Sequence, residues 1–276
     1  MKYENSFKKH NDWSFRLFIE HAHLFLPIIE DLKKKRANKE IKGLRKLFNQ
    51  FNISKDSRIL DFSCGIGRHT IPLAKDGFTM VGYDPSFFYL EKANEFASKE
   101  ITPFTPRLKF IRGSPYNASK VLFKKNELNF NAVIIMDNSF GFKNEDDDVR
   151  MLKEIYKVSS KNCILVMETE NRDWRIANFE TSTFFNSKKI KMYEKWRFNF
   201  ETSISESESL FYEKNKEKSF RLSLKINTTL RLYSLHELKN VLKKSGWNYL
   251  KSFGDIRTLK PFDGNSPNII TISSRV

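Results

Sequence analysis

Residues 58–70 read RILDFSCGIGRHT and carry the strongest structural signal in the chain. Residues 58–62 are a short apolar segment typical of a buried strand, and residues 63–67 follow at once as a glycine-containing turn. Residues 70–74 then have helical spacing of apolar side chains and end shortly before Gly77, a residue favoured at helix C-termini. The stretch therefore predicts a strand, a tight turn and a helix in direct succession.

The alternation of strands and helices continues on the C-terminal side of this stretch. We expect strands at residues 79–84, 108–111, 132–136 and 163–167, and helices at residues 86–98 and 145–158. Residues 132–136 are apolar throughout, which is typical of a strand buried on both faces. Such alternation indicates an α/β fold whose parallel sheet is covered on both sides.

The remaining segments follow other patterns. From about residue 183 apolar side chains recur at every second position, which predicts antiparallel strands with one face in water. Residues 235–245 return to a helical pattern, and two further strands are expected near residues 247–253 and 268–273. The first 55 residues are amphipathic and helical, with Pro27 expected to break or kink the run. We expect four parts, at residues 1–56, 57–182, 183–230 and 231–276.

Composition limits the class of protein. The chain has 276 residues, of which 39% are hydrophobic, enough for a sizeable core. No apolar run approaches the ~18 residues of a membrane span, and no secretory signal is readable, so we expect a cytoplasmic protein that is not in a membrane. The net charge of +16 raises the possibility of an RNA partner, although the lysines are spread along the whole chain as on solvated helix faces.

The turn at residues 63–67 has the chemistry of a ligand site. Gly65 and Gly67 let a ligand approach the backbone, and Asp84, which closes the next strand, could accept hydrogen bonds from ribose hydroxyls. A dinucleotide fingerprint would need Gly or Ala where Thr70 stands, and a P-loop would need Gly-Lys-Ser/Thr at the position of Arg68 and His69. Of the ligands that suit such a turn, S-adenosylmethionine is the one that remains. The simpler interpretation is a tight strand-to-helix turn that binds no ligand.

Several stretches together resemble one family. ILDFSCGIGRH at residues 59–69 resembles motif I of the class I S-adenosylmethionine-dependent methyltransferases, in particular a prokaryotic subgroup whose motif ends Gly-x-Gly-Arg-His. The segments that match further motifs of the subgroup, in order, are GYDPS at 82–86, NSFGF at 138–142, ENRDW at 170–174, RLYSLHEL at 231–238 and DGNSP at 263–267. The resemblance covers residues 57–276 and implies a Rossmann-like sheet with an N-terminal helical cover and an antiparallel insertion between its fifth and sixth strands.

The resemblance also implies which residues bind the cofactor, whose product would be S-adenosylhomocysteine. The implied set is Asp61, Ser63, Cys64, Gly65 and Gly67 around the methionine end, Asp84, Pro85 and Ser86 at the ribose, Ser114 at the adenine, and Asp137 and Asn138 beside the sulfonium. Two positions depart from the family pattern. Ser63 replaces the first glycine of the usual turn, and Ser114 stands where the family often has an acid.

Polar residues outside the cofactor motifs are candidates for the acceptor side. We predict catalytic roles for His69, Asp173 and Tyr233, and substrate contacts for Asn171, Arg172 and Arg231, each weighed against a purely structural role. No metal is predicted, because the histidines lack partners at zinc-ligand spacing. The absence of an Asn/Asp-Pro-Pro-Tyr/Phe motif disfavours methylation of base amino groups, and Cys64 and Cys163 are badly placed for a nucleophile.

The sequence therefore predicts methyl transfer, by in-line displacement, to an oxygen or nitrogen nucleophile of a small molecule. An RNA or protein acceptor is the alternative that the basic composition favours. A binding module that has kept the fold but lost its activity is a third interpretation. The sequence assigns neither the acceptor nor an oligomeric state.

Overall fold

A computed structural model describes residues 12–100 and 107–276 of the chain. Its centre is an eight-stranded sheet in the order β11-β10-β12-β5-β4-β1-β2-β3. The strands are β1 (Arg58–Phe62), β2 (Thr79–Asp84), β3 (Leu108–Arg112), β4 (Phe130–Ile135), β5 (Ser159–Glu170), β10 (Trp247–Asp255), β11 (Lys260–Pro261) and β12 (Asn268–Arg275). Strands β1 to β5 are parallel, and β12 joins β5 in antiparallel register.

The strand order creates a point where the chain reverses direction across the sheet. From β1 the chain builds outward to β2 and β3, and β4 then returns to pair with the other side of β1. Ligands of open α/β sheets bind where strands end beside such a point. The carboxyl ends of β1, β2 and β4 are therefore where the fold places a site.

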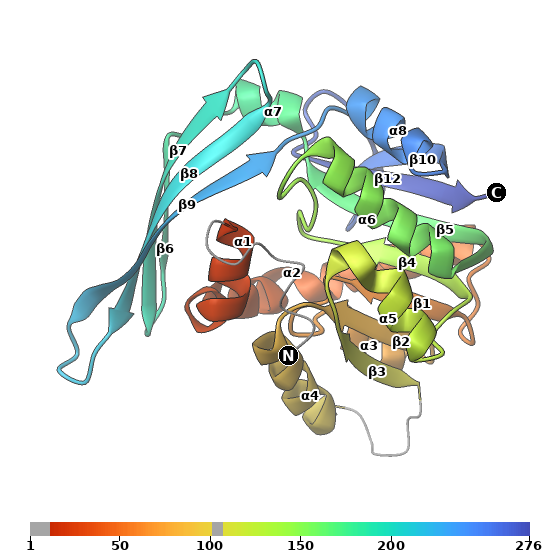
Figure 1. Ribbon diagram of the computed structural model, residues 1–276, viewed down its shortest axis with the longest axis horizontal. Helices are drawn as coiled ribbons and strands as arrows, with labels where there is room; N and C mark the ends of the chain where they lie inside the picture. Colours follow the sequence, from red (N-terminus) through yellow and green to blue (C-terminus); the bar gives the residue numbers. More distant parts are fainter. Residues whose placement is uncertain (1–11, 101–106) are drawn as a thin grey trace.

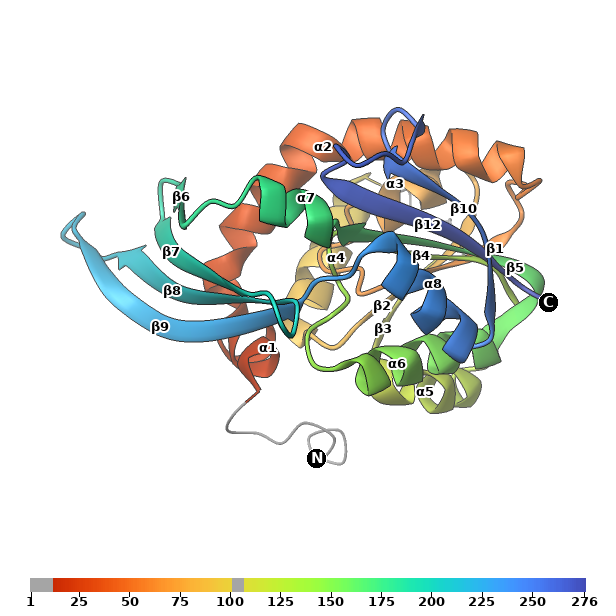
Figure 2. The same cartoon turned by 90° about the horizontal axis from the view of Figure 1, so that it is seen from above.

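Helices cover both faces of this sheet (Figure 1, Figure 2). Side chains of α2 (Ala22–Gln50) and α3 (Thr70–Lys75) pack on one face with Ile59 and Met80. Side chains of α5 (Ala118–Lys124), α6 (Glu145–Val158) and α8 (Leu235–Lys244) pack on the other with Leu60 and Phe62. Each central strand is thus apolar on both faces, and the parallel sheet predicted from the alternating pattern is confirmed.

A second sheet lies between β5 and β10 in the chain and stands apart from the first (Figure 1). It has four antiparallel strands in sequential order, β6 (Ser182–Asn186), β7 (Ile190–Asn199), β8 (Ile204–Lys214) and β9 (Phe220–Arg231). The short helix α7 (Arg172–Ala177) leads into it. The separate antiparallel sheet predicted from the period of two is confirmed.

The N-terminal helices connect the two sheets. The short α1 (Trp13–Phe15) and the π-helical turn η2 (Arg16–Glu20) precede α2. Leu17 and Leu24 pack against Met192 and Phe211 of the second sheet. The break expected at Pro27 does not occur, because α2 begins at Ala22 and continues through the proline. The chain bends at His21, before the helix starts. A proline in the second turn costs one backbone hydrogen bond, and burial of the apolar face offsets this loss. Within the described residues, no helix is long and apolar enough to cross a membrane.

Candidate functional site

The turn after β1 adopts the conformation that its glycines permit. Gly65 and Gly67 have φ values of +53° and +75°, and Ser63 has φ +64°. Such left-handed backbone is costly for a residue with a Cβ, so Ser63 holds a conformation in which glycine would be unstrained. The backbone N–H of Ser63 donates to the Tyr83 carbonyl at 2.7 Å, which ties the turn to the end of β2. Replacement of the family's glycine by Ser63 therefore leaves the left-handed turn intact.

Asp84 shapes this turn from the neighbouring strand. Its carboxylate accepts hydrogen bonds from the backbone N–H groups of Gly65 at 2.9 Å and Ser86 at 2.8 Å. Burial raises the pKa of Asp84 to about 6, although both bonds oppose the shift. No atom outside its chain neighbours lies within 4 Å of the position that a Cβ on Gly65 would occupy. The turn thus presents bare backbone to open space beside a buried carboxylate, which fits the sugar and amino-acid parts of S-adenosylmethionine.

The other residues implied around the turn support its shape. Asp61 is buried in β1 and accepts a hydrogen bond of 2.5 Å from the Thr70 hydroxyl, while burial raises its pKa. Cys64 is also buried, and its pKa lies well above the usual value because of burial and the neighbouring carboxylates. The Ser86 hydroxyl accepts from the backbone of Tyr89 at 3.4 Å. The side chain of Asp61 thus ties β1 to the start of α3, the side chain of Ser86 bonds the first turn of α4 (Phe87–Glu100), and Cys64 lacks the environment of a reactive thiol.

A buried charge cluster joins the turn to α2, and it engages the predicted catalytic His69. The Nε2 atom of His69 lies 2.9 Å from Oε2 of Glu40, and Arg68 lies 2.8 Å from the same oxygen. Against the cost of burial, His69 and Arg68 hold the pKa of Glu40 below its usual value. His69 is itself buried and held by this carboxylate. This position favours a role for His69 in supporting the turn over the role of general base that we expected.

The same cluster reaches the end of β4. Arg68 lies 3.0 Å from the carboxylate of Asp137, which follows β4, so one guanidinium bridges α2 and two strand ends. The backbone N–H of Asp137 donates to Glu168 on β5 at 3.4 Å. Burial, with the charges of Asp137 and Glu40, raises the pKa of Glu168 to about 7. Asn138 accepts a hydrogen bond from the backbone of Glu170. Asp137 and Asn138 thus lie at the predicted strand end, already engaged with protein groups.

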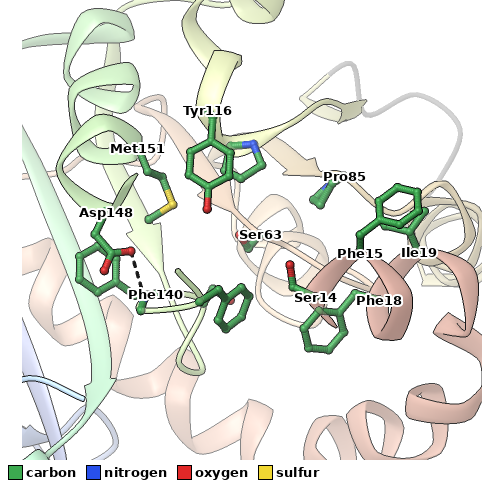
Figure 3. A pocket seen from close by; sticks show the side chains of 14 residues that line it. Ser14, Phe15, Phe18, Ile19, Ser63, Pro85, Tyr116, Phe140, Asp148 and Met151 are labelled. Carbon is green, nitrogen blue, oxygen red and sulfur yellow. Dashed lines mark hydrogen bonds between the residues drawn. The ribbon is translucent and has the colours of Figure 1, made fainter. Parts of the chain in front are cut away.

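A cavity opens directly in front of the turn (Figure 3). Ser63 and Pro85 line the side at the ends of β1 and β2, and Tyr116, Met151 and Asp148 line the side formed by η3 (Pro115–Asn117) and α6. The residues that close it are Ser14, Phe15, Phe18 and Ile19 of α1 and η2, with Phe140 and Phe142 from the loop after β4. The free volume is only about 60 Å³. A nucleoside-sized ligand needs several hundred Å³, so α1 and η2 must shift to admit one.

Asp148 is a site residue that sequence reasoning missed. It lines the cavity and accepts hydrogen bonds from the Tyr233 hydroxyl at 2.6 Å and from the backbone N–H of Gly141 at 3.1 Å. Burial raises the pKa of Asp148 to about 6, a value suited to a proton acceptor near neutral pH. In the sequence Asp148 is hidden in the acidic first turn of a helix. Tyr233, predicted as catalytic, instead holds this carboxylate.

The remaining predicted residues form a separate ion-pair group. Asn171 is fully buried, and its side chain donates to the Ser266 carbonyl at 2.9 Å. Arg172 lies 2.7 Å from Asp173 and 2.8 Å from Glu237, and Arg231 lies 2.8 Å from Glu237. These contacts join α7, β9 and the start of α8. None of the four predicted residues lines the cavity at the turn, so their predicted catalytic and substrate roles have no support from the geometry.

The predicted adenine contact lies beside a second cavity. Ser114 and Pro85 line a space of about 620 Å³ that runs along β3. The Ser114 hydroxyl accepts from the backbone of Tyr116 at 3.4 Å and so begins η3. Because Pro85 lines both cavities, the two spaces adjoin at the end of β2.

Comparison with known proteins agrees with the fold. The sequence profile of the methyltransferase domain family matches residues 32–252. The Bacillus subtilis protein YqeM, whose name assigns it provisionally to the methyltransferases, is 25% identical over 214 residues, which are 76% of this chain and 81% of that protein. The glycine/sarcosine N-methyltransferase of Aphanothece halophytica is 30% identical over 117 residues, which are 42% of this chain and 41% of that enzyme.

Solved structures share the architecture over nearly the whole chain. An S-adenosylmethionine-dependent methyltransferase from Clostridium acetobutylicum superposes with a TM-score of 0.73 at 16% identity, over 93% of this chain and 98% of that one. The chain belongs to the methyltransferase domain family, and within it to the class I S-adenosylmethionine-dependent enzymes. The resemblance predicted from the motifs is confirmed at the level of the family.

Proposed function

We propose that the cavity in front of the turn, once α1 and η2 move, admits a small polar molecule that receives a methyl group on oxygen or nitrogen. The observation that carries this proposal is the composition of the cavity wall. Of the described residues that line it, none is lysine or arginine, and residues of α1 and η2 close one side of it (Figure 3). Lys143 and Arg150 lie over the ring of Tyr116 at the edge of the cavity, but the lining itself has Asp148 as its one charged side chain among the described residues, and an enclosed site suits a small acceptor.

We further propose that Asp84 contacts the ribose of S-adenosylmethionine and that Ser63, Gly65, Gly67 and Pro85 surround the rest of the cofactor. When bound, this cofactor supplies an electrophilic methyl group on a good leaving group. The protein then has chiefly to hold the acceptor in line, with Asp148 placed to receive a proton from it. Orientation of this kind contributes on the order of 7–11 kcal/mol to a lower barrier.

A related structure supports a small acceptor. The amino pentose methyltransferase CalS10 of Micromonospora echinaspora shares the fold with a TM-score of 0.64 at 12% identity, over 91% of this chain and 96% of that one. At this identity the likeness extends only to the fold. It is compatible with a small acceptor between the sheet edge and the N-terminal helices.

Binding of the cofactor is tested by calorimetry with S-adenosylmethionine and S-adenosylhomocysteine. Asp84→Ala removes a carboxylate that would accept charged hydrogen bonds, worth about 1.5–3 kcal/mol, so the affinity is expected to fall by about tenfold or more. Asp84→Asn retains an acceptor oxygen for the turn and should show the same direction of change. Asp146→Ala, on the exposed side of α6, is the matched control.

The outcomes separate the alternatives. Heat from the wild type with weakened binding in both Asp84 variants supports the ribose contact, and equal affinity in all variants contradicts it. No heat from the wild type would favour the inactive binding module. The acceptor is then sought by incubating labelled cofactor with metabolite and RNA fractions; label that is transferred only to RNA would contradict the small-molecule proposal.

A further inference from the structure

A groove lined by cations lies away from the cavity, on the outer side of α2. Its lining residues are Lys39, Lys42, Arg45, Lys46 and Asn49 of α2 with Arg257 and Thr258 of the turn between β10 and β11. We call this set the basic groove. Its free volume is about 400 Å³, within the range of small-ligand sites. The C-terminal half of α2, which contributes most of the lining, leads toward the start of β1, whereas the cavity lies where the strands end.

The lysines of the basic groove have no acidic partners. Lys39, Lys42 and Lys46 lie three and four residues apart and so share one helix face, over about 10 Å. Among residues 12–100 and 107–276, none of the acids forms an ion pair or hydrogen bond with these three lysines. Like charges at this spacing repel one another. The chain therefore concentrates positive charge here without neutralising it.

The two arginines, in contrast, are held in place. Arg45 forms two hydrogen bonds of 2.6 Å with Asp76, and Arg257 forms bonds of 2.8–3.1 Å with Asp255. Each carboxylate engages Nε and Nη2, which leaves Nη1 of both guanidinium groups for another acceptor. Two oriented arginines lie beside three exposed lysines, so part of the cost of ordering these cations around an anion is already met.

The two walls of the basic groove, α2 and the turn after β10, are closely packed against each other. Gly43 of α2 faces the backbone of Ile256 so closely that a Cβ would lie 1.6 Å from the Ile256 carbonyl oxygen. Helix and turn therefore touch through their backbones, one residue away from Lys42 on one side and Arg257 on the other. This contact places the backbone of Lys42 close to that of Arg257.

We propose that the basic groove binds a compact anion that carries two or three linked phosphate groups. The described lining residues include no acid, and the three lysines without acidic partners match several negative charges rather than one, whereas Arg45 and Arg257 are already paired with Asp76 and Asp255. The lining has no aromatic side chain on which a base could stack, which argues against a nucleotide or RNA read through its bases.

The test is calorimetry of the full chain with tripolyphosphate at low ionic strength. The triple variant Lys39→Gln, Lys42→Gln, Lys46→Gln keeps a polar side chain and a similar helix propensity while removing three charges. We expect its affinity for tripolyphosphate to be at least tenfold weaker. The control variant Lys188→Gln, Lys189→Gln, Lys216→Gln removes three equally exposed charges from the second sheet and should bind as the wild type does.

Three further readouts make the result decisive. Circular dichroism and thermal unfolding show whether the triple variant is folded, and tripolyphosphate should raise the unfolding temperature of the wild type but not of this variant. Orthophosphate should bind at least tenfold more weakly than tripolyphosphate. Equal losses in both triple variants would overturn the proposal, because they would report only net charge. Binding of single-stranded RNA that strengthens with length, without binding of tripolyphosphate, would overturn it in favour of an RNA track.

Discussion

Asp148 carries the sharpest chemical expectation at the level of a single residue. Its carboxyl must be ionised to accept a proton, and burial raises its pKa to about 6. Methyl transfer to an acceptor that loses a proton should therefore accelerate as the pH rises through 6. The rate (kcat/KM) of Asp148→Asn should be low and lack this rise, as measured from pH 5 to 8.

A variant of Tyr233 tests whether Asp148 accepts the proton, because a purely structural role of Asp148 would not shift the pH dependence of the rate. Its hydroxyl donates to Asp148 and lowers the pKa of that carboxyl. Tyr233→Phe should therefore move the rise in rate to higher pH while activity at pH 8 remains. A rate profile with the same midpoint in the wild type and Tyr233→Phe would contradict the assignment of Asp148 as the proton acceptor.

Single residues also show how far motifs can be interpreted without a fold. Gly65, Gly67 and Asp84 meet at one turn, because adjacent parallel strands end at the same edge of the sheet. Glu40 and Asp148 have no motif around them and come from helices distant in sequence. Their partners, His69 and Tyr233, were predicted to act on the substrate but instead contact these two carboxylates. A side chain's role depends on partners that only packing supplies.

At the level of elements, α2 is the helix that connects the parts of the molecule. Its start packs on the second sheet, Glu40 supports the turn after β1, and its end packs on the central sheet. Gly43 allows the close approach of α2 to the turn after β10. The docking of this helix therefore affects both the cofactor turn and the basic groove.

Gly43→Ala tests the docking of α2. Alanine favours a helix over glycine by about 1 kcal/mol, but the added Cβ would overlap a carbonyl oxygen, and overpacking costs about 1–3 kcal/mol. Because the obstacle is backbone, we expect the clash to dominate and the free energy of unfolding in urea to fall by up to about 2 kcal/mol. Gly264→Ala, where no atom lies within 4 Å, is the control. A stabilised Gly43→Ala would mean that the helix docks less tightly than described.

The second sheet contains a strand that the pattern of apolar residues in the sequence does not reveal. Strands β7 and β9 were expected from alternating apolar residues, whereas β8 was not. On β8 the inward positions are Ser205, Ser207 and Ser209, which are buried although they are polar. Ser209 donates to Glu194 at 2.7 Å and Ser207 pairs with Thr228 at 2.8 Å, so cross-strand hydrogen bonds replace apolar contacts. Because the buried side chains of β8 are polar, the sequence gave no indication that this strand is buried on one face.

At the level of the whole molecule, buried acids determine how stability responds to pH. Asp84, Asp148 and Glu168 have pKa values raised to about 6, 6 and 7, with burial as the largest cause. An acid whose pKa is raised on folding contributes stability below its unfolded pKa, near 4, and this contribution is lost as the pH rises through the folded value. These three groups should make the protein less stable at pH 8 than at pH 5.

Glu168→Gln isolates one of these contributions. A pKa raised from 4.5 to about 7 means that ionised Glu168 costs the folded state about 3 kcal/mol above pH 7. The difference in unfolding free energy between Glu168→Gln and the wild type should therefore shift in favour of the variant by about this amount from pH 4.5 to pH 8. Urea unfolding at several pH values measures the difference, with Glu91→Gln on exposed α4 (Phe87–Glu100) as the control. A pH-independent difference would contradict the assigned burial of the charge around Asp137 and Glu40.

The linear chain was sufficient for the order and type of most elements, for the methyltransferase family and for the expected cofactor turn. Local spacing encodes these features, because hydrophobic period, turn glycines and a strand-ending aspartate are all short-range signals. Folding added the partners of His69 and Tyr233, the cavity closed by α1 and η2, and the gathering of lysines with Arg257. Each of these depends on which distant segments pack together, and no short stretch of sequence contains that information.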